Sequence, residues 1–196
     1  MGTDTPSAIV IAGPNGAGKS TLAPVLVHDA LGGVPYVNAD VIAAHLSPDD
    51  PDAAALTAAR TMLLRLRALA AERSDFAFET TLATRSFARW LERLRGEGYA
   101  VHLIFLWLRH PDLAVARVAH RVRLGGHDIP LEVIRRRYDR GLANFFSLYQ
   151  RLTTTWRFYD NSLAAPPRLL ARGSGLETAI VTDRATWRRI QGDGTA

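Results

Sequence analysis

No cysteine occurs among the 196 residues, and this absence excludes several kinds of chemistry at once. Without thiols the chain has no disulfide, no thiolate zinc or iron–sulfur site, and no cysteine nucleophile. The longest strongly apolar run, residues 103–108, is far shorter than the roughly 20 residues that a membrane-spanning helix needs. Residues 1–7 carry no basic side chain and do not resemble a secretory signal. We therefore expect a soluble protein of the cytoplasm.

Lysine is almost as scarce. Of the 24 basic residues, only Lys19 is a lysine, and the others are arginines. Against 19 acidic residues, this composition gives a net charge of +5 and a pI near 10.2. A basic balance favours anionic partners, which include phosphates, nucleotides and nucleic acid, without selecting among them.

Short apolar runs alternate with helical stretches along the chain. Strands are predicted at Ala8–Gly13, Tyr36–Asp40, Phe76–Thr80 and Val101–Leu108, with weaker candidates at Arg168–Arg172 and Thr178–Thr182 that would form a hairpin. Helices are predicted at Lys19–Ala30, from Ser47–Asp52 to about Arg73, at Ser86–Arg95, from Pro111 to Gly125, from Pro130 to about Tyr159 with a bend near Gly141, and at Arg184–Ile190. This alternation is typical of an α/β fold with a parallel sheet covered on both faces. The length predicts one domain over residues 1–191, followed by a disordered tail at 192–196.

The segment Gly13-Pro14-Asn15-Gly16-Ala17-Gly18-Lys19-Ser20 matches the pattern G-x-x-x-x-G-K-[ST] between a predicted strand and a predicted helix. Glycines let successive backbone N–H groups converge on phosphate oxygens, and the helix adds the positive end of its dipole. The pattern predicts a loop for a nucleoside triphosphate, in which Lys19 reaches the β- and γ-phosphates. Ser20 would bind Mg²⁺, and Thr21 would contact the α-phosphate. The only lysine of the chain thus stands where this loop requires one.

Three other classes of nucleotide-binding protein fit the sequence poorly. The glycines at 13, 16 and 18 do not have the G-x-G-x-x-G spacing of a dinucleotide-binding fold. A guanine site of the Asn-Lys-x-Asp type needs a second lysine, which the chain lacks. The fourth predicted strand ends in Leu106-Trp107-Leu108-Arg109 without the acid that a motor-type ATPase carries there. The sequence therefore favours a small kinase over a translocase.

Two carboxylates end the second and third predicted strands, at the edge of the sheet where ligands bind in such folds. Asp40 could accept a proton from a substrate hydroxyl or hold Mg²⁺ through water. Its alternative role is the N-cap of a helix over Val41–Leu46. Glu79 could contact a substrate hydroxyl, or it could form a structural salt bridge with Arg85.

Arginines follow on two predicted helices. Arg117 and Arg121 lie four residues apart on one helix face, before Gly125-Gly126-His127-Asp128. This arrangement predicts a lid over residues 117–130 that brings an arginine to the transferring phosphate, although a solvated helix face is the alternative. The pattern does not choose among Arg117, Arg121 and Arg123. Arg135-Arg136-Arg137 resemble a nucleic-acid patch, but three consecutive helical residues fan through about 200° and cannot form one stripe.

Four segments together resemble the zeta-toxin family of P-loop kinases: Gly13–Thr21, Asn38-Ala39-Asp40, Phe78–Leu82 and Arg117–Pro130. The resemblance extends over roughly Ala8 to Asn161. It implies a kinase-type P-loop fold with about five strands, ATP and Mg²⁺ as cofactors, and phosphorylation of a sugar hydroxyl of a UDP-N-acetylglucosamine. It also implies that Asp40 is the general base, that Glu79 and Thr81 contact the substrate, that Arg117 stabilises charge, and that a small antitoxin is the partner.

The chain departs from the family pattern in two places. Thr80-Thr81-Leu82-Ala83-Thr84-Arg85 replaces a Gly-Thr-x-Arg run, so that Arg85 becomes a candidate substrate contact. His127 stands before Pro130 where the family has a second lid arginine, a role that Arg121 could take.

The sequence as a whole predicts an ATP-dependent kinase that phosphorylates a hydroxyl of a small anionic metabolite, such as a UDP-amino sugar. The predicted catalytic residues are Asp40, Lys19, Arg117 and Arg121, and the predicted substrate contacts are Asp40, Glu79, Thr81 and Arg85. Two alternatives remain open: an NTPase that acts on or is regulated by nucleic acid, and a metabolic kinase of the nucleoside or shikimate type.

Overall fold

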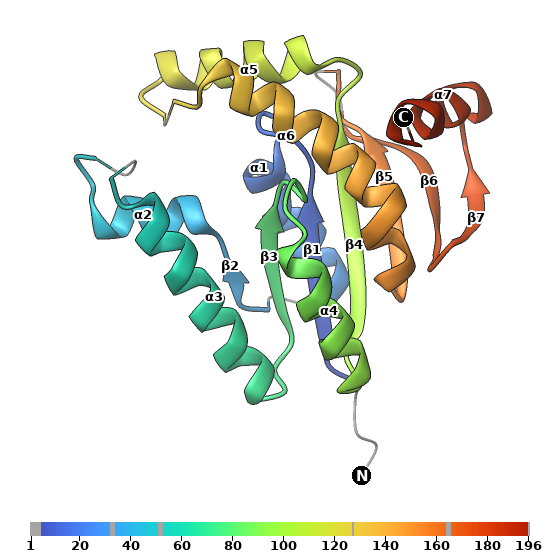
Figure 1. Ribbon diagram of the computed structural model, residues 1–196, viewed down its shortest axis with the longest axis horizontal. Helices are drawn as coiled ribbons and strands as arrows, with labels where there is room; N and C mark the ends of the chain where they lie inside the picture. The colour runs from blue at the N-terminus through green and yellow to red at the C-terminus, as the bar shows by residue number, and fades with distance from the viewer. Residues whose placement is uncertain (1–4, 32–33, 51–52, 127, 164–165, 196) are drawn as a thin grey trace.

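A mostly parallel sheet forms the centre of the molecule (Figure 1). The computed structural model describes residues 5–31, 34–50, 53–126, 128–163 and 166–195, and within them the sheet has seven strands in the order β2-β3-β1-β4-β5-β6-β7. The parallel strands are β1 (Ser7–Ala12), β2 (Tyr36–Val37), β3 (Phe76–Thr80), β4 (Ala100–Trp107) and β5 (Thr155–Asp160). The antiparallel hairpin of β6 (Arg168–Ser174) and β7 (Glu177–Val181) extends one edge. The predicted α/β class and the predicted hairpin are confirmed.

Helices lie on both faces of the sheet and across its upper edge (Figure 1). They are α1 (Lys19–Leu31), α2 (Ala39–Leu46), α3 (Ala55–Ala71), α4 (Ser86–Gly96), α5 (Pro111–Arg123), α6 (Leu131–Asn144) and α7 (Arg184–Thr195). In Figure 1, α4 and α6 lie in front of the sheet, α1 lies behind it, and α5 crosses above the strands. No helix of the described part of the chain is long and apolar enough to cross a membrane.

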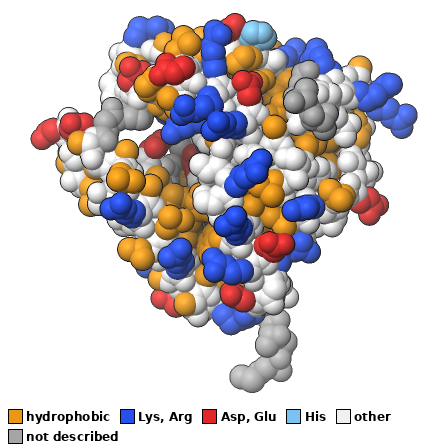
Figure 2. Space-filling view, in the orientation of Figure 1, with side chains coloured by type: hydrophobic (Ala, Val, Ile, Leu, Met, Phe, Trp, Pro, Cys, Tyr) orange, Lys and Arg blue, Asp and Glu red, His pale blue; other side chains and the backbone are white. Residues whose placement is uncertain are grey.

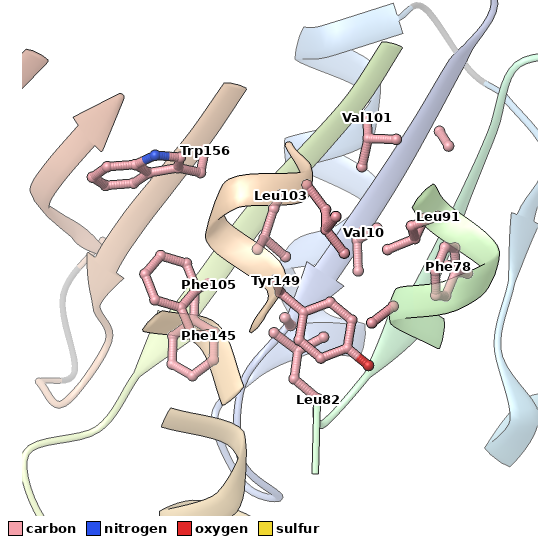
Figure 3. Close-up of a cluster of buried hydrophobic side chains, with 14 of the residues drawn as sticks. Val10, Phe78, Leu82, Leu91, Val101, Leu103, Phe105, Phe145, Tyr149 and Trp156 are labelled. Atoms are coloured by element: carbon pink, nitrogen blue, oxygen red, sulfur yellow. The ribbon is translucent and has the colours of Figure 1, made fainter. Parts of the chain in front are cut away.

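Two hydrophobic clusters, one on each face, hold these layers together. Successive side chains of a strand point to opposite faces, so Ala8, Val10 and Ala12 enter one cluster while Ile9 and Ile11 enter the other. Both sets are buried, which explains why β1 is apolar from Ala8 to Ala12 rather than alternating. Figure 3 shows part of the first cluster, in which aromatic side chains such as Phe105 and Trp156 lie among aliphatic ones. The stacked rings of Phe105 and Phe158, 4.9 Å apart, join β4 to β5 there.

The predicted helix from Pro130 to about Tyr159 is wrong in its second half. α6 ends at Asn144 and passes through a π turn (Phe145–Tyr149) and a 3₁₀ turn (Gln150–Leu152) into β5. In β5, Trp156 and Phe158 are buried while Arg157 between them is exposed. That alternation follows the period of a strand, and it places β5 beside β4 as the fifth parallel strand.

Three smaller differences concern element boundaries. The predicted strand Tyr36–Asp40 shortens to Tyr36–Val37, because α2 begins at Ala39. α3 begins at Ala55, later than the predicted start in 47–52. α7 continues to Thr195 and includes residues 192–195, for which the sequence predicts a disordered tail, while Ala196 lies outside the described residues.

Candidate functional site

A cavity of about 750 Å³ opens at the carboxyl edge of the parallel strands. Its lining comes from the glycine loop after β1, the start of α2, the end of β3, and helices α5 and α6. Figure 2 shows this hollow, with acidic side chains inside it and basic side chains beside it. The lining residues are Asn15, Gly16, Gly18, Lys19, Ser20, Thr21, Asn38, Ala39, Asp40, Glu79, Thr80, Thr81, Ala116, Arg117, His120, Arg121, Arg123 and Arg137.

The loop between β1 and α1 has a backbone that only glycine adopts easily. Gly13, Gly16 and Gly18 have φ values of 140°, 74° and 84°. A Cβ on Gly13 would lie 2.2 Å from the carbonyl oxygen of Leu106, so the loop also packs directly on the end of β4. On the other side, the side-chain amide of Asn161 donates to the carbonyl of Ala17 at 2.8 Å. These contacts hold the loop amides in place at the amino end of α1.

Lys19 extends from the first turn of α1 back over its own loop. Its Nζ donates to the carbonyl oxygens of Gly13 and Pro14, both at 3.0 Å. Burial lowers the pKa of Lys19, and nearby Glu79 and Asp40 act in the opposite direction. An anionic ligand beside this ammonium group would stabilise its charge further. Such a ligand is what the sequence predicts for the loop.

Asn38 connects three elements beside the cavity: α2, the end of β3 and the start of α1. Its Oδ1 accepts from the backbone N–H of Asp40 at 2.8 Å and so caps α2. Its Nδ2 donates to Glu79 Oε1 at 2.9 Å and lies 3.4 Å from Ser20 Oγ. The alternative role of Asp40 as the helix cap is therefore wrong, since Asn38 is the cap. The carboxylate of Asp40 is instead an exposed group in the first turn, facing the cavity.

Glu79 is held at the end of β3 by two neutral donors, the hydroxyl of Tyr36 and the amide of Asn38. Burial raises the pKa of Glu79, although Lys19 and Ser20 act against that shift. The predicted salt-bridge alternative with Arg85 is not what holds it, because Arg85 is exposed at the start of α4 and does not line the cavity. A half-buried carboxyl in such surroundings can accept or donate a hydrogen bond to a ligand hydroxyl.

Replacing Asn38 by alanine is expected to lower the free energy of unfolding by about 2 kcal/mol, measured by urea denaturation. The loss combines a helix cap with a hydrogen bond to a carboxylate. His110→Ala is the matched control, because His110 caps α5 from an exposed position through Asp112 N. That control should cost less than about 1 kcal/mol. Equal losses in the two variants would contradict a special role for Asn38.

Helix α5 places Arg117 against the loop. Its Nη1 donates to the carbonyl of Gly16 at 3.4 Å, and its Nη2 donates to the carbonyl of Ser162, after β5, at 3.1 Å. Arg121 and Arg123 also line the cavity from α5. His127, the residue in the place of the family's second lid arginine, lies outside the described residues.

Helix α6 adds a residue that sequence reasoning did not select. The three consecutive arginines separate as helical geometry requires: Arg135 pairs with Asp112 at 2.7 Å, Arg136 is exposed, and Arg137 lines the cavity. Nη1 of Arg137 donates to Asn15 Oδ1 at 3.3 Å. Helical spacing alone predicts that Arg135 and Arg137 lie on different faces of the helix. Only the packing of α6 shows that the face with Arg137 is turned toward the loop.

Most of the predicted site residues meet in this one cavity. Those that line it are Asn15, Gly16, Gly18, Lys19, Ser20, Thr21, Asp40, Glu79, Thr81, Arg117 and Arg121. Those that do not line it are Gly13, Pro14, Ala17 and Arg85. The first three belong to the loop and contact neighbouring protein groups rather than the cavity. Asn38 and Arg137 are the important residues that the sequence did not single out.

The sequence matches the family model described as Zeta toxin over residues 2–161, which is most of the chain. The chain belongs to the zeta-toxin family. The resemblance drawn from the loop, the two acidic segments and the lid segment is thus confirmed. This zeta-toxin family member is also 30% identical over 131 residues to an uncharacterized protein of Haemophilus influenzae, an alignment that covers 67% of this chain and 91% of that protein.

Solved structures of low sequence identity share the fold of this zeta-toxin family member. A chain of the AvrRxo1-ORF1:-ORF2 complex with ATP gives a TM-score of 0.72 at 15% identity, covering 98% of this chain and 65% of that chain. A chain of the PezAT chromosomal toxin–antitoxin system of Streptococcus pneumoniae gives a TM-score of 0.66 at 17% identity, covering 99% and 85%. The present chain therefore spans about two thirds of the AvrRxo1 chain, and the likeness to both concerns the fold.

Proposed function

We propose that this chain is an ATP-dependent phosphotransferase that moves the γ-phosphoryl group to a hydroxyl of a small anionic metabolite. The observation that carries the proposal is the shared cavity, in which the phosphate loop with Lys19 faces Asp40 and Glu79. A triphosphate group and an acceptor hydroxyl could meet there without any rearrangement of the sheet. Membership of the zeta-toxin family supports the same reaction type.

The loop fits a magnesium-bound triphosphate. Its three glycines leave room where side chains would stand, and the hydroxyl of Ser20 lies exposed in the cavity beside Lys19. Ser20 would be the residue of this chain that holds Mg²⁺, and the ion would supply charge neutralisation between the β- and γ-phosphates. Lys19 and the loop amides would bind and orient the phosphate oxygens.

Asp40 is the group that we assign to the acceptor hydroxyl. It faces the cavity from the first turn of α2, and the contact between its own N–H and Asn38 fixes that turn relative to Ser20. A carboxylate in this place can orient the hydroxyl and take its proton as the oxygen attacks phosphorus. Glu79 and Thr81 would contact the rest of the acceptor. Arg117 and Arg121 would stabilise charge on the phosphoryl group.

The charge of the cavity favours an anionic acceptor. Five cationic side chains and two carboxylates line it, which is a formal excess of three positive charges with histidine neutral. Positive charge beyond what a magnesium-bound triphosphate neutralises would attract an acceptor that carries phosphate, such as a UDP-amino sugar. A nucleic-acid substrate has less support within the described residues, because Arg135, Arg136 and Arg137 diverge rather than forming a stripe.

A small antitoxin protein is the proposed macromolecular partner. Support comes from the zeta-toxin family and from PezAT, a toxin–antitoxin system whose structure contains a chain of the same fold.

Transfer of labelled γ-phosphate from ATP to a metabolite library that includes UDP-N-acetylglucosamine tests the proposal. We expect one labelled acceptor with a phosphorylated hydroxyl, and no labelled product with Lys19→Met. ATP hydrolysis stimulated by nucleic acid, strongly weakened by moderate salt and without any labelled metabolite, would instead support the NTPase alternative.

A further inference from the structure

Arg137 reaches the phosphate side of the cavity from a helix that is firmly held. The neighbouring residues Ile134 and Tyr138 are buried, and the hydroxyl of Tyr138 donates to the carbonyl of Leu108 at 2.6 Å. This anchoring turns the side chain of Arg137 toward Asn15 in the glycine loop. The guanidinium group therefore lies over the glycine loop on a helix that buried contacts hold in place.

Arg137 has a neutral hydrogen-bond partner and no ion-pair partner within the described residues. Its hydrogen bond to the neutral amide oxygen of Asn15 is 3.3 Å long, and no carboxylate of the described chain lies within ion-pair distance. Burial lowers the pKa of Arg137, while the more distant Asp40 acts in the opposite direction. A half-buried guanidinium that faces a cavity can offer its remaining N–H donors to an anion bound there.

Two other arginines nearby, Arg117 and Arg135, have protein groups as hydrogen-bond partners. Arg117 donates to two backbone carbonyls, those of Gly16 and Ser162. Arg135 pairs with Asp112, in the first turn of α5, at 2.7 Å. Among these three, Arg137 has the guanidinium that is open toward the cavity.

We propose that Arg137 is a further catalytic residue, whose guanidinium contacts the oxygens of the transferring phosphoryl group. The inference rests on the proposed function. In the reaction the bond from phosphorus to the ADP oxygen breaks, the bond from phosphorus to the acceptor oxygen forms, and the hydroxyl proton passes to Asp40. Arg137 exchanges no proton; it binds two phosphoryl oxygens at once, which the planar fork of a guanidinium allows and a lysine ammonium does not.

Calorimetric titration with two ligands tests this role without knowledge of the acceptor. The first ligand is MgATP, and the second is MgADP with aluminium fluoride, which mimics the phosphoryl group in transfer. The proteins are the intact chain and its variants Arg137→Ala, Arg137→Lys and Arg136→Ala. Arg136 is the matched control, because it is the adjacent arginine on the same helix and is exposed outside the cavity.

We expect Arg137→Ala to weaken the aluminium fluoride complex by about 10²–10³-fold while weakening MgATP less than about 10-fold. Arg137→Lys should recover little of the loss, and Arg136→Ala should bind both ligands like the intact chain. Equal weakening of both ligands by Arg137→Ala, or no weakening of either, would overturn the assignment. If the intact chain bound neither ligand, the proposed function would fail as well, so the two failures are distinguishable. Urea denaturation of Arg137→Lys shows whether a loss reflects unfolding.

Discussion

Replacing Asp40 by asparagine is expected to lower the rate of phosphoryl transfer by about 10²–10⁴-fold and to leave MgATP binding nearly unchanged. Asparagine keeps the size of the side chain and the first turn of α2, which Asn38 caps independently of the carboxylate. It removes the group that takes the proton from the acceptor hydroxyl. Turnover is measured with the acceptor found in the transfer screen or, without one, with water as the acceptor.

Asp139→Asn is the control for this prediction, because Asp139 is an exposed carboxylate of α6 that does not line the cavity. It should have the activity of the intact chain. Full turnover in the Asp40→Asn variant would show that another group takes the proton. Glu79 would then be the next candidate, since it is the other carboxylate of the cavity lining.

Replacing Lys19 by methionine should abolish measurable turnover, with a decrease of at least about 10³-fold. Methionine retains an unbranched stem but cannot donate to phosphate oxygens or offer positive charge to the transferring group. The variant tests the loop alone, since this is the only lysine of the chain and Arg117, Arg121 and Arg137 remain in place. Arg136→Ala serves again as an exposed cation whose loss should have no effect.

The same variant should be at least as stable as the intact chain at neutral pH. Burial lowers the pKa of Lys19, so its charged form is less favourable in the folded chain than in the unfolded chain. The charge therefore destabilises the fold most at pH values below the lowered pKa, and this penalty shrinks as the pH rises from that value to the ordinary pKa of a lysine. Urea denaturation at neutral and alkaline pH checks this sign. A large loss of stability in Lys19→Met at neutral pH would contradict it.

The parts of the fold that follow from local patterns were predictable, whereas β5 was not. β1, β3 and β4 are short apolar runs bounded by turn residues, and their predicted positions hold to within about a residue. β5 follows α6 through turns of helical conformation, so a helical reading of residues 130–159 had no obvious end. The alternation of Trp156, Arg157 and Phe158 was the signal for a strand. Its meaning depends on the contact with Phe105, which lies far away in the sequence.

The residues of the candidate site also fall into those that a local pattern predicts and those that depend on distant contacts. Lys19 and the glycines form a motif whose physics is local, so their meeting in one loop could be predicted. Asn38 was not singled out because its importance comes from contacts with Ser20 and Glu79 on two other elements. Arg137 belongs to a run of three arginines, and only the burial of Ile134 and Tyr138 shows which of the three faces the cavity. Arg85, by contrast, was expected near the acceptor and lies outside the cavity lining.

A crystal structure of the chain with magnesium and the ATP analogue AMP-PNP tests the central claim most directly. We predict density for the three phosphates along the glycine loop, with the γ-phosphate at Lys19 Nζ and Ser20 and with its outer face toward the carboxylate of Asp40. Arg137 should then contact a γ-phosphate oxygen. Phosphates bound outside this cavity, or an Asp40 carboxylate separated from the γ-phosphate by other protein groups, would contradict the assignment of one shared site for phosphate and acceptor.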